Sequence, residues 1–108
     1  MADQSPWGRT LTLGAANVPS NLLTLMIAAD SQCPRVVGAL MIQPDVDANT
    51  ARFFWGNPGT LSPTDRGAEF FAGQPFGISS VLNNISLQKL EIMSDEDGQT
   101  VNVTTVTW

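Results

Sequence analysis

The side chains of this protein that come closest to a chemical motif are the oxygen-bearing residues that follow its central apolar run. Asp45, Asp47 and Asn49 have the spacing that opens an EF-hand calcium loop. Such a loop also needs a glycine at its sixth position and a glutamate at its twelfth, and these positions hold Thr50 and Gly56. The pattern therefore favours a plain polar turn over a calcium site.

Two further groups of carboxylates are candidates for chemistry. Asp95, Glu96 and Asp97 are consecutive and would form at most a weak, generic cation site on a turn. Asp65 and Glu69 could supply the carboxyl pair of a glycoside hydrolase. A chain with ten acidic residues produces such pairs by chance, so neither group predicts a metal or catalytic site.

The groups that most enzymes use are missing from the sequence. There is no histidine, the commonest general base and a frequent ligand of transition metals. Cys33 is the single cysteine, so it has no partner for an internal disulfide and no histidine to activate it as a nucleophile. We therefore expect a protein that is not an enzyme, with no catalytic residue, no metal and no cofactor.

Composition limits the partners of the chain. The net charge is −5 and the five basic residues are scattered, so no basic cluster could neutralise nucleic acid or an anionic membrane. No stretch approaches the ~20 apolar residues of a membrane span, and residues 1–9 do not resemble a secretory signal. Charged residues make up only 14% of the chain, against a usual ~25%. Either the surface is simply neutral, or a partner or copies of the chain cover part of it.

The elements that must position these residues are short strands. Residues 36–56 indicate two strands joined by a polar loop, and the other strands are expected to cover this pair. Residues 9–13 alternate between polar and apolar and predict a half-buried strand. Residues 18–30 suit a helix or a strand, and a capping residue at Ser20 or Asn21 with one apolar face favours a short helix. That face would hold Leu22, Leu23, Met26 and Ile27.

The two ends of the chain are predicted to differ in structure, with an irregular arm at the N-terminus and a hairpin at the C-terminus. Residues 1–8 predict an N-terminal arm, because Pro6 and Gly8 flank Trp7 and keep it out of regular structure. Trp7 would then either tuck back onto its own domain or insert into another subunit. Residues 88–94 and 99–108 predict a hairpin around the turn Asp97-Gly98, with a bulge near Thr104-Thr105.

Loops and short strands fill the middle of the sequence. Residues 57–67 predict a loop exposed to solvent or to a partner, and residues 80–87 predict another loop. Residues 68–71 and 74–79 predict two short strands interrupted at 72–73. The fold class is therefore all-β, an antiparallel β-sandwich or jelly-roll-like domain spanning residues 9–108, with one short helix near residues 20–30.

Several segments between residues 36 and 108 resemble small virion proteins of tailed bacteriophages. In that pattern a strand ending in Gln and an Asp-containing loop lead into an aromatic-Gly strand end, which usually begins with Tyr and here holds Phe and Trp. The matching segments are 40–45 with Asn49, 54–56, 61–62, 67–71, 89–92 and 98–101. The resemblance implies a β-sandwich structural protein of the particle, specifically a capsid decoration (cement) protein.

This resemblance sets the expected partners and location. It implies binding to the major capsid protein and to copies of the chain, with a trimer favoured, on the capsid surface of a virion after synthesis in the host cytoplasm. Large aromatic and apolar residues outside the core are the expected contacts. They are Pro6, Trp7, Leu61, Pro63 and Trp108. Trp55 is expected in the core. The alternatives are a head–tail or tail component of the virion, and a carbohydrate-binding module that stacks sugars on Trp7, Trp55 or Trp108.

Overall fold

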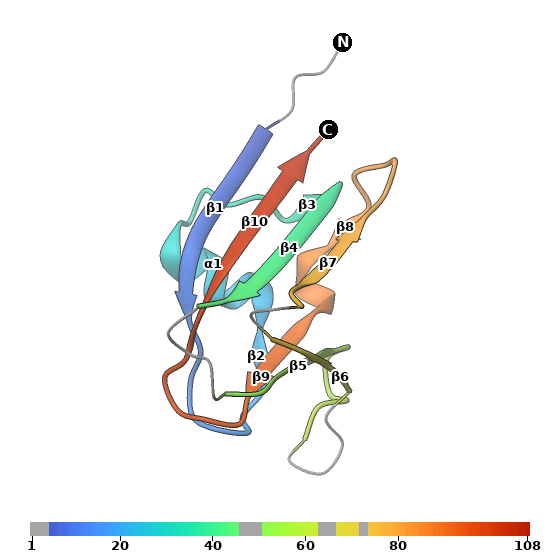
Figure 1. Cartoon of the computed structure of the whole chain (residues 1–108). Helices are drawn as coiled ribbons and strands as arrows, with labels where there is room; N and C mark the ends of the chain where they lie inside the picture. The colour runs from blue at the N-terminus through green and yellow to red at the C-terminus, as the bar shows by residue number, and fades with distance from the viewer. Residues whose placement is uncertain (1–4, 46–50, 63–66, 72–73) are drawn as a thin grey trace.

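Two four-stranded antiparallel sheets pack against each other in the computed structural model, which describes residues 5–45, 51–62, 67–71 and 74–108 (Figure 1). The strands are β1 (Ser5–Thr12), β2 (Ser20–Asn21), β3 (Val36–Val37), β4 (Ala39–Pro44), β5 (Phe53–Gly56), β6 (Ala68–Phe70), β7 (Phe76–Ser79), β8 (Ile85–Ser86), β9 (Glu91–Ser94) and β10 (Thr100–Thr107). The helices are α1 (Leu22–Ala29) and the 3-10 turn η1 (Leu87–Lys89). The first sheet has the order β1-β10-β4-β7 and the second β2-β9-β5-β6, while β3 and β8 form a small separate ribbon.

The pairing of the strands is nested. β1 pairs with β10, β2 with β9, β4 with β7, and β5 with β6, so the first half of the chain pairs with the second half in reverse order. Eight strands folded in this way into two sheets make a jelly roll. The expected all-β, jelly-roll-like sandwich with one short helix is confirmed.

The core lies between the two sheets. Leu11, Ile42 and Val101 point inward from the first sheet, and Phe53 and Phe70 come from the second. The Phe53 and Phe70 rings have centroids 5.7 Å apart. Burying each such side chain stabilises the fold by roughly 1.5–3 kcal/mol. Trp55 packs against this core with its ring 4.3 Å from that of Phe76, as expected.

Helix α1 packs against the core and contacts β1 and η1. Asn21 caps it, because its side-chain oxygen accepts a hydrogen bond from the Thr24 backbone N–H at 3.2 Å. Leu22 and Met26 are fully buried. The preference for a helix over a strand is therefore confirmed, but Ile27 is exposed and its place on the buried face was wrong.

The C-terminal hairpin is the main expectation that the structure contradicts. β9 and β10 are joined by the expected turn, and Gly98 has the positive φ of 62° that the turn requires. The two strands nevertheless belong to different sheets, β9 between β2 and β5, and β10 between β1 and β4. The turn therefore connects a strand of the second sheet to a strand of the first sheet. The expected bulge is also wrong, because the pairing of β1 with β10 runs unbroken past Thr104 and the buried Thr105.

The N-terminal arm is wrong over residues 5–8. Ser5–Thr12 is one continuous strand that pairs with Thr100–Thr107, so Trp7 does lie in regular structure. Pro6 is tolerated because β1 is an edge strand of the sheet. Residues 1–4 of the expected arm lie outside the described residues.

Four smaller expectations also need correction. β4 and β5 flank the polar loop as predicted, but they lie in opposite sheets and do not pair with each other. The loop expected at residues 80–87 contains β8, which pairs with β3, and the strand expected from Gln88 begins at Glu91 after η1. The loop that begins at Asn57 is partly internal, because Leu61 is buried against Phe54 and Met93.

Candidate docking surface

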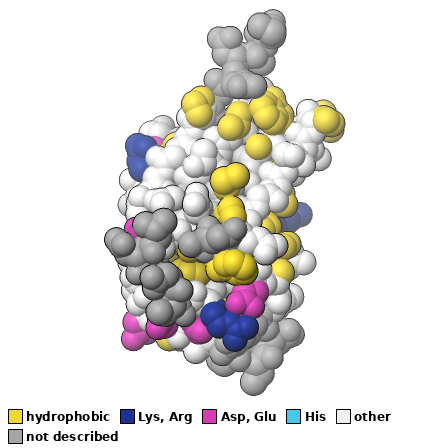
Figure 2. All heavy atoms as spheres, viewed as in Figure 1, with side chains coloured by type: hydrophobic (Ala, Val, Ile, Leu, Met, Phe, Trp, Pro, Cys, Tyr) yellow, Lys and Arg dark blue, Asp and Glu magenta, His cyan; other side chains and the backbone are white. Residues whose placement is uncertain are grey.

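Among the described residues, no outward position within the strands of the sheet β1-β10-β4-β7 is charged. Asp45 follows directly after β4, and its Oδ2 accepts a hydrogen bond of 3.2 Å from the outward Thr100 Oγ1 at the end opposite Ala39. Inward residues such as Leu11, Ile42 and Val101 fix the alternation, so every second residue of each strand points to solvent. The outward positions are Pro6, Gly8, Thr10, Thr12, Ala39, Met41, Gln43, Gly77, Ser79, Thr100, Asn102, Thr104 and Val106. Figure 2 shows the upper part of this face in yellow and white, with dark blue at its left margin.

One end of this face is apolar. Pro6 pairs with Val106, and Val106 pairs with Ala39, so the three lie side by side across the sheet. Met41 is exposed next to them, and Gly77, its partner on β7, has no side chain. The result is a shallow hollow bounded by Ala39, Met41, Gly77, Thr104 and Val106.

The loop between β7 and β8 adds two protruding side chains at the same end (Figure 1). Val81 is 94% exposed and Leu82 is 63% exposed. Ser80 Oγ accepts a hydrogen bond of 3.2 Å from the Leu82 backbone N–H and so holds the turn. We call Pro6, Met41, Val81, Leu82, Val106 and Trp108 together the apolar end of the molecule.

Trp108 fixes that loop to the sheet. Its indole Nε1 donates to the Ser80 carbonyl oxygen at 2.7 Å, and its backbone N–H donates to Asn83 Oδ1 at 2.8 Å. The ring lies over Gly38, where any Cβ would collide with the indole. Trp108 is still 38% exposed. Trp108 is therefore held in place by the fold, while its role as a contact residue stays a prediction.

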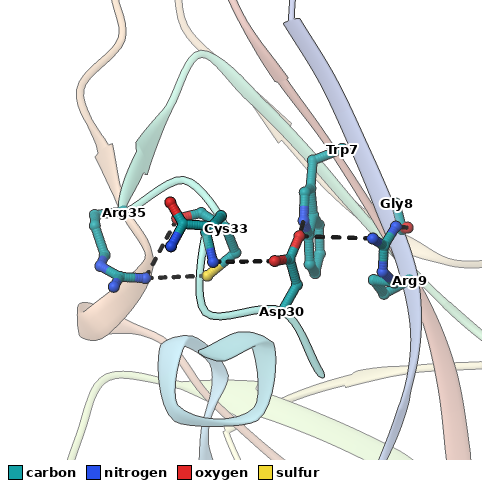
Figure 3. A network of polar contacts seen from close by, with 7 residues as sticks. Trp7, Gly8, Arg9, Asp30, Cys33 and Arg35 are labelled. Carbon is teal, nitrogen blue, oxygen red and sulfur yellow. Dashed lines mark hydrogen bonds and ion pairs between the residues drawn. The ribbon is translucent and has the colours of Figure 1, made fainter. Parts of the chain in front are cut away.

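Trp7 tucks onto its own domain, the first of its two expected positions. Its indole Nε1 donates to Asp30 Oδ2 at 2.9 Å, and Arg9 Nη2 lies 3.6 Å from the same oxygen (Figure 3). The hydrogen bonds from Trp7 and from the Gln32 backbone N–H, with the charge of Arg9, lower the pKa of Asp30. This polar latch joins the edge strand β1 to the end of α1.

The other expected contact residues are distributed differently. Pro6 is exposed at the apolar end, near Trp108, because Ser5 pairs with Thr107. Leu61 is a buried core residue, and Pro63 lies outside the described residues. The sequence analysis missed Met41, Val81 and Leu82. The pair Val81-Leu82 could have been found, because two adjacent apolar residues in a predicted loop have no core to enter.

The carboxylates of the described residues lie apart from one another or bind within the fold. Among the described residues, no three metal-ligating side chains lie together. Asp95 Oδ1 accepts from the Arg52 N–H at 2.8 Å and Asp97 Oδ1 accepts from the Ala16 N–H at 2.6 Å, so both tie loops together. Glu69 forms a two-bond ion pair with Arg52. Asp47, Asn49 and Asp65 lie outside the described residues.

Within the described part of the chain, no helix is both long and apolar enough to cross a membrane. Comparison with protein-family models, with curated proteins and with solved structures gives no significant match. The described residues form a jelly-roll sandwich in which the outward strand positions of the first sheet are uncharged and one end carries exposed apolar side chains.

Proposed function

We propose that this chain is a structural protein of a tailed-bacteriophage virion, specifically a capsid decoration protein that binds the lattice of major capsid protein. The observation that carries the proposal is the apolar end, where Val81, Leu82 and Met41 are exposed beside an uncharged sheet face. Such a surface favours contact with another protein over contact with water. The resemblance of several segments to virion proteins is the reason for proposing a tailed-bacteriophage particle.

The energetics fit a protein that acts in many copies. Burying an exposed Val or Leu side chain against a partner contributes roughly 1.5–3 kcal/mol before the losses of association are subtracted. Each contact would therefore be modest. Many copies on one lattice act together, which makes the whole array stable although each interface is small. Copies of the chain are expected to associate as well, and the resemblance implies a trimer.

The tryptophans argue against the sugar-binding alternative. Trp7 donates its indole N–H to Asp30, and Trp55 packs on Phe76 in the core. Trp108 is the remaining candidate for stacking a sugar, and its ring already packs over Gly38. The alternative of a head–tail or tail component uses the same kind of surface, so the experiment must include tails.

A pair of matched substitutions tests the proposal. Val81→Asp places a charge at the apolar end, whereas Val18→Asp makes the same change at a residue that is 52% exposed in the loop between β1 and β2. Purified variants are mixed with empty capsids and with isolated tails of the phage that encodes the chain, and bound protein is measured after sedimentation.

We expect the wild-type chain and Val18→Asp to sediment with capsids alike. Val81→Asp should bind about tenfold more weakly, since losing roughly 1.4 kcal/mol changes an affinity by that factor. Equal binding of the two variants would remove the apolar end as the contact surface. Binding to tails alone would favour the tail alternative, and binding to neither would overturn a role in the virion.

A further inference from the structure

The edge strand β7 offers a second contact through the backbone groups of its open side, next to the hollow at the apolar end that β7 also lines. Among the described strands, β7 pairs with β4 only. We propose that its free side pairs antiparallel with β7 of a second copy of the chain, which joins two four-stranded sheets into one sheet of eight strands across a twofold axis. This inference concerns self-association and stands whether or not the chain binds a capsid.

The backbone geometry shows which groups of β7 are available. The Ser80 N–H donates to the Gly38 carbonyl at 2.8 Å, and the register places Ile78 opposite Leu40. In an antiparallel pair, hydrogen-bonded positions alternate along the strand. Residues 76, 78 and 80 therefore bond toward β4, and the N–H and C=O groups of Gly77 and Ser79 point to the open side. Both residues are exposed.

Within the described part of the chain, the other edges of the two four-stranded sheets have protecting features that β7 lacks. Native proteins block exposed edges with charges, prolines, bulges or covering elements. β1 carries Pro6 and Arg9 and is joined to the end of α1 by the polar latch. β6 carries Glu69, which forms an ion pair with Arg52. β2 has only two residues. β7 itself has the sequence Phe-Gly-Ile-Ser, without a charge or a proline.

A second copy fits this edge better than an unrelated strand does. In a twofold pairing centred on Ile78, Gly77 faces the partner's Ser79 and the two isoleucines face each other. Four backbone hydrogen bonds would form, two in each Gly–Ser pair. Ile78 is 37% exposed, and the pairing would cover it with another β-branched side chain, a favourable cross-strand pair.

Charge supports the same occupant. Two copies with a net charge of −5 each repel one another, so they can meet closely only where no ionisable side chain lies. Within the described residues, β7 and the adjacent outward positions of β4 form such a region. A four-residue strand buries little area, so we expect a weak dimer that depends on protein concentration. A trimer, if one forms, would have to use another surface.

Lysine substitutions test the dimer. Ile78→Lys places like charges directly opposite each other at the twofold axis, and Val81→Lys makes the same charge change on the loop tip. Sedimentation of the full chain over a concentration series should give a monomer–dimer equilibrium for the wild type and Val81→Lys. Ile78→Lys should weaken the association at least about tenfold, with circular dichroism and thermal unfolding showing that it remains folded.

A cysteine substitution tests the register without relying on a loss of binding. The two Ile78 Cα atoms would lie about 4.5 Å apart in a close antiparallel pair, which suits a disulfide. Mild oxidation should therefore cross-link Ile78→Cys into dimers faster than Val81→Cys, although Val81 is the more exposed residue. The wild type supplies the baseline, because its Cys33 is buried.

Three results would overturn the inference. They are a wild-type monomer at every concentration, an oligomer that Ile78→Lys leaves unchanged, and faster cross-linking of Val81→Cys than of Ile78→Cys. Capsid binding separates this inference from the proposed function. Val81→Lys should lose capsids and keep the dimer, and Ile78→Lys should lose the dimer while a single copy still binds capsids.

Discussion

The two ends of the sandwich use their side chains in different ways. At the end formed by the β9–β10 turn, Asp95 and Asp97 accept backbone hydrogen bonds from Arg52 and Ala16 and so hold neighbouring loops. At the apolar end, Val81 is almost wholly in water and Leu82 is more than half exposed. The acidic side chains have hydrogen-bonding partners within the chain, whereas the apolar side chains would be buried only by a partner molecule. Substitutions at the two ends should therefore separate stability from binding.

The largest effect on stability is expected at Trp108, the one member of the apolar end with a clear structural role. Trp108→Ala removes the ring over Gly38 and the hydrogen bond to Ser80. We expect the free energy of unfolding to fall by about 2 kcal/mol, less than for a fully buried aromatic. Urea unfolding measures this change. A loss below about 0.5 kcal/mol would mean that the ring is held only loosely and serves contact alone.

A smaller loss is expected at the opposite end. Asp97→Ala removes the acceptor of the Ala16 N–H while leaving Gly98 and its positive φ in place. Because this hydrogen bond is exposed, we expect a loss of about 1 kcal/mol. Urea unfolding measures it, and capsid binding should be unchanged. Weaker capsid binding would show that the acidic end also touches the partner.

The Asp30 latch gives an effect that is present near neutral pH and disappears in acid. Hydrogen bonds from Trp7 and the Gln32 N–H lower the pKa of Asp30 below its ordinary 3.8 in the folded state. A depressed carboxyl pKa contributes stability above the unfolded pKa, and this contribution is lost as pH falls through the folded pKa. Asp30→Asn should therefore be less stable than the wild type at pH 6 and converge toward it below about pH 4. Parallel pH curves for the two proteins would show that the latch contributes nothing.

The smallest effect on stability is expected at Val81. Val81→Ser should change the free energy of unfolding by less than about 0.5 kcal/mol, as exposed positions usually do. Thermal and urea unfolding of this variant beside the wild type provide the measurement. A clear destabilisation would mean that the loop tip packs within the molecule. The apolar end would then contribute to stability as the acidic end does.

Local sequence patterns predicted the individual strands and the helix, but they did not predict which strands pair with each other. Alternation identified the strand at Leu11, and the Asn21 cap identified the helix, because both signals lie within a few residues. The turn at Asp97-Gly98 was predicted correctly, but a turn reports only that the chain reverses. Whether its two strands bond to each other depends on the other strands, which no short window contains.

The candidate surface was predicted only in part. Pro6 and Trp108 were found because aromatic and proline residues near chain ends stand out. Met41 was missed because it lies within an apolar run that suggested burial on both faces, although an outer strand face in this sheet meets solvent. Leu61 was misjudged because a polar loop gave no sign that one of its residues returns to the core.

The nested pairing of β1 with β10 has a practical consequence for anyone who handles this protein. Because Ser5 lies beside Thr107, both described ends of the chain lie at the apolar end. An affinity tag or fluorescent protein fused after Trp108 would therefore sit next to the surface proposed for docking. The same fusion could block assembly and be mistaken for a lack of affinity. An epitope inserted in the turn before Gly98 would emerge at the far end of the molecule and leave that surface open.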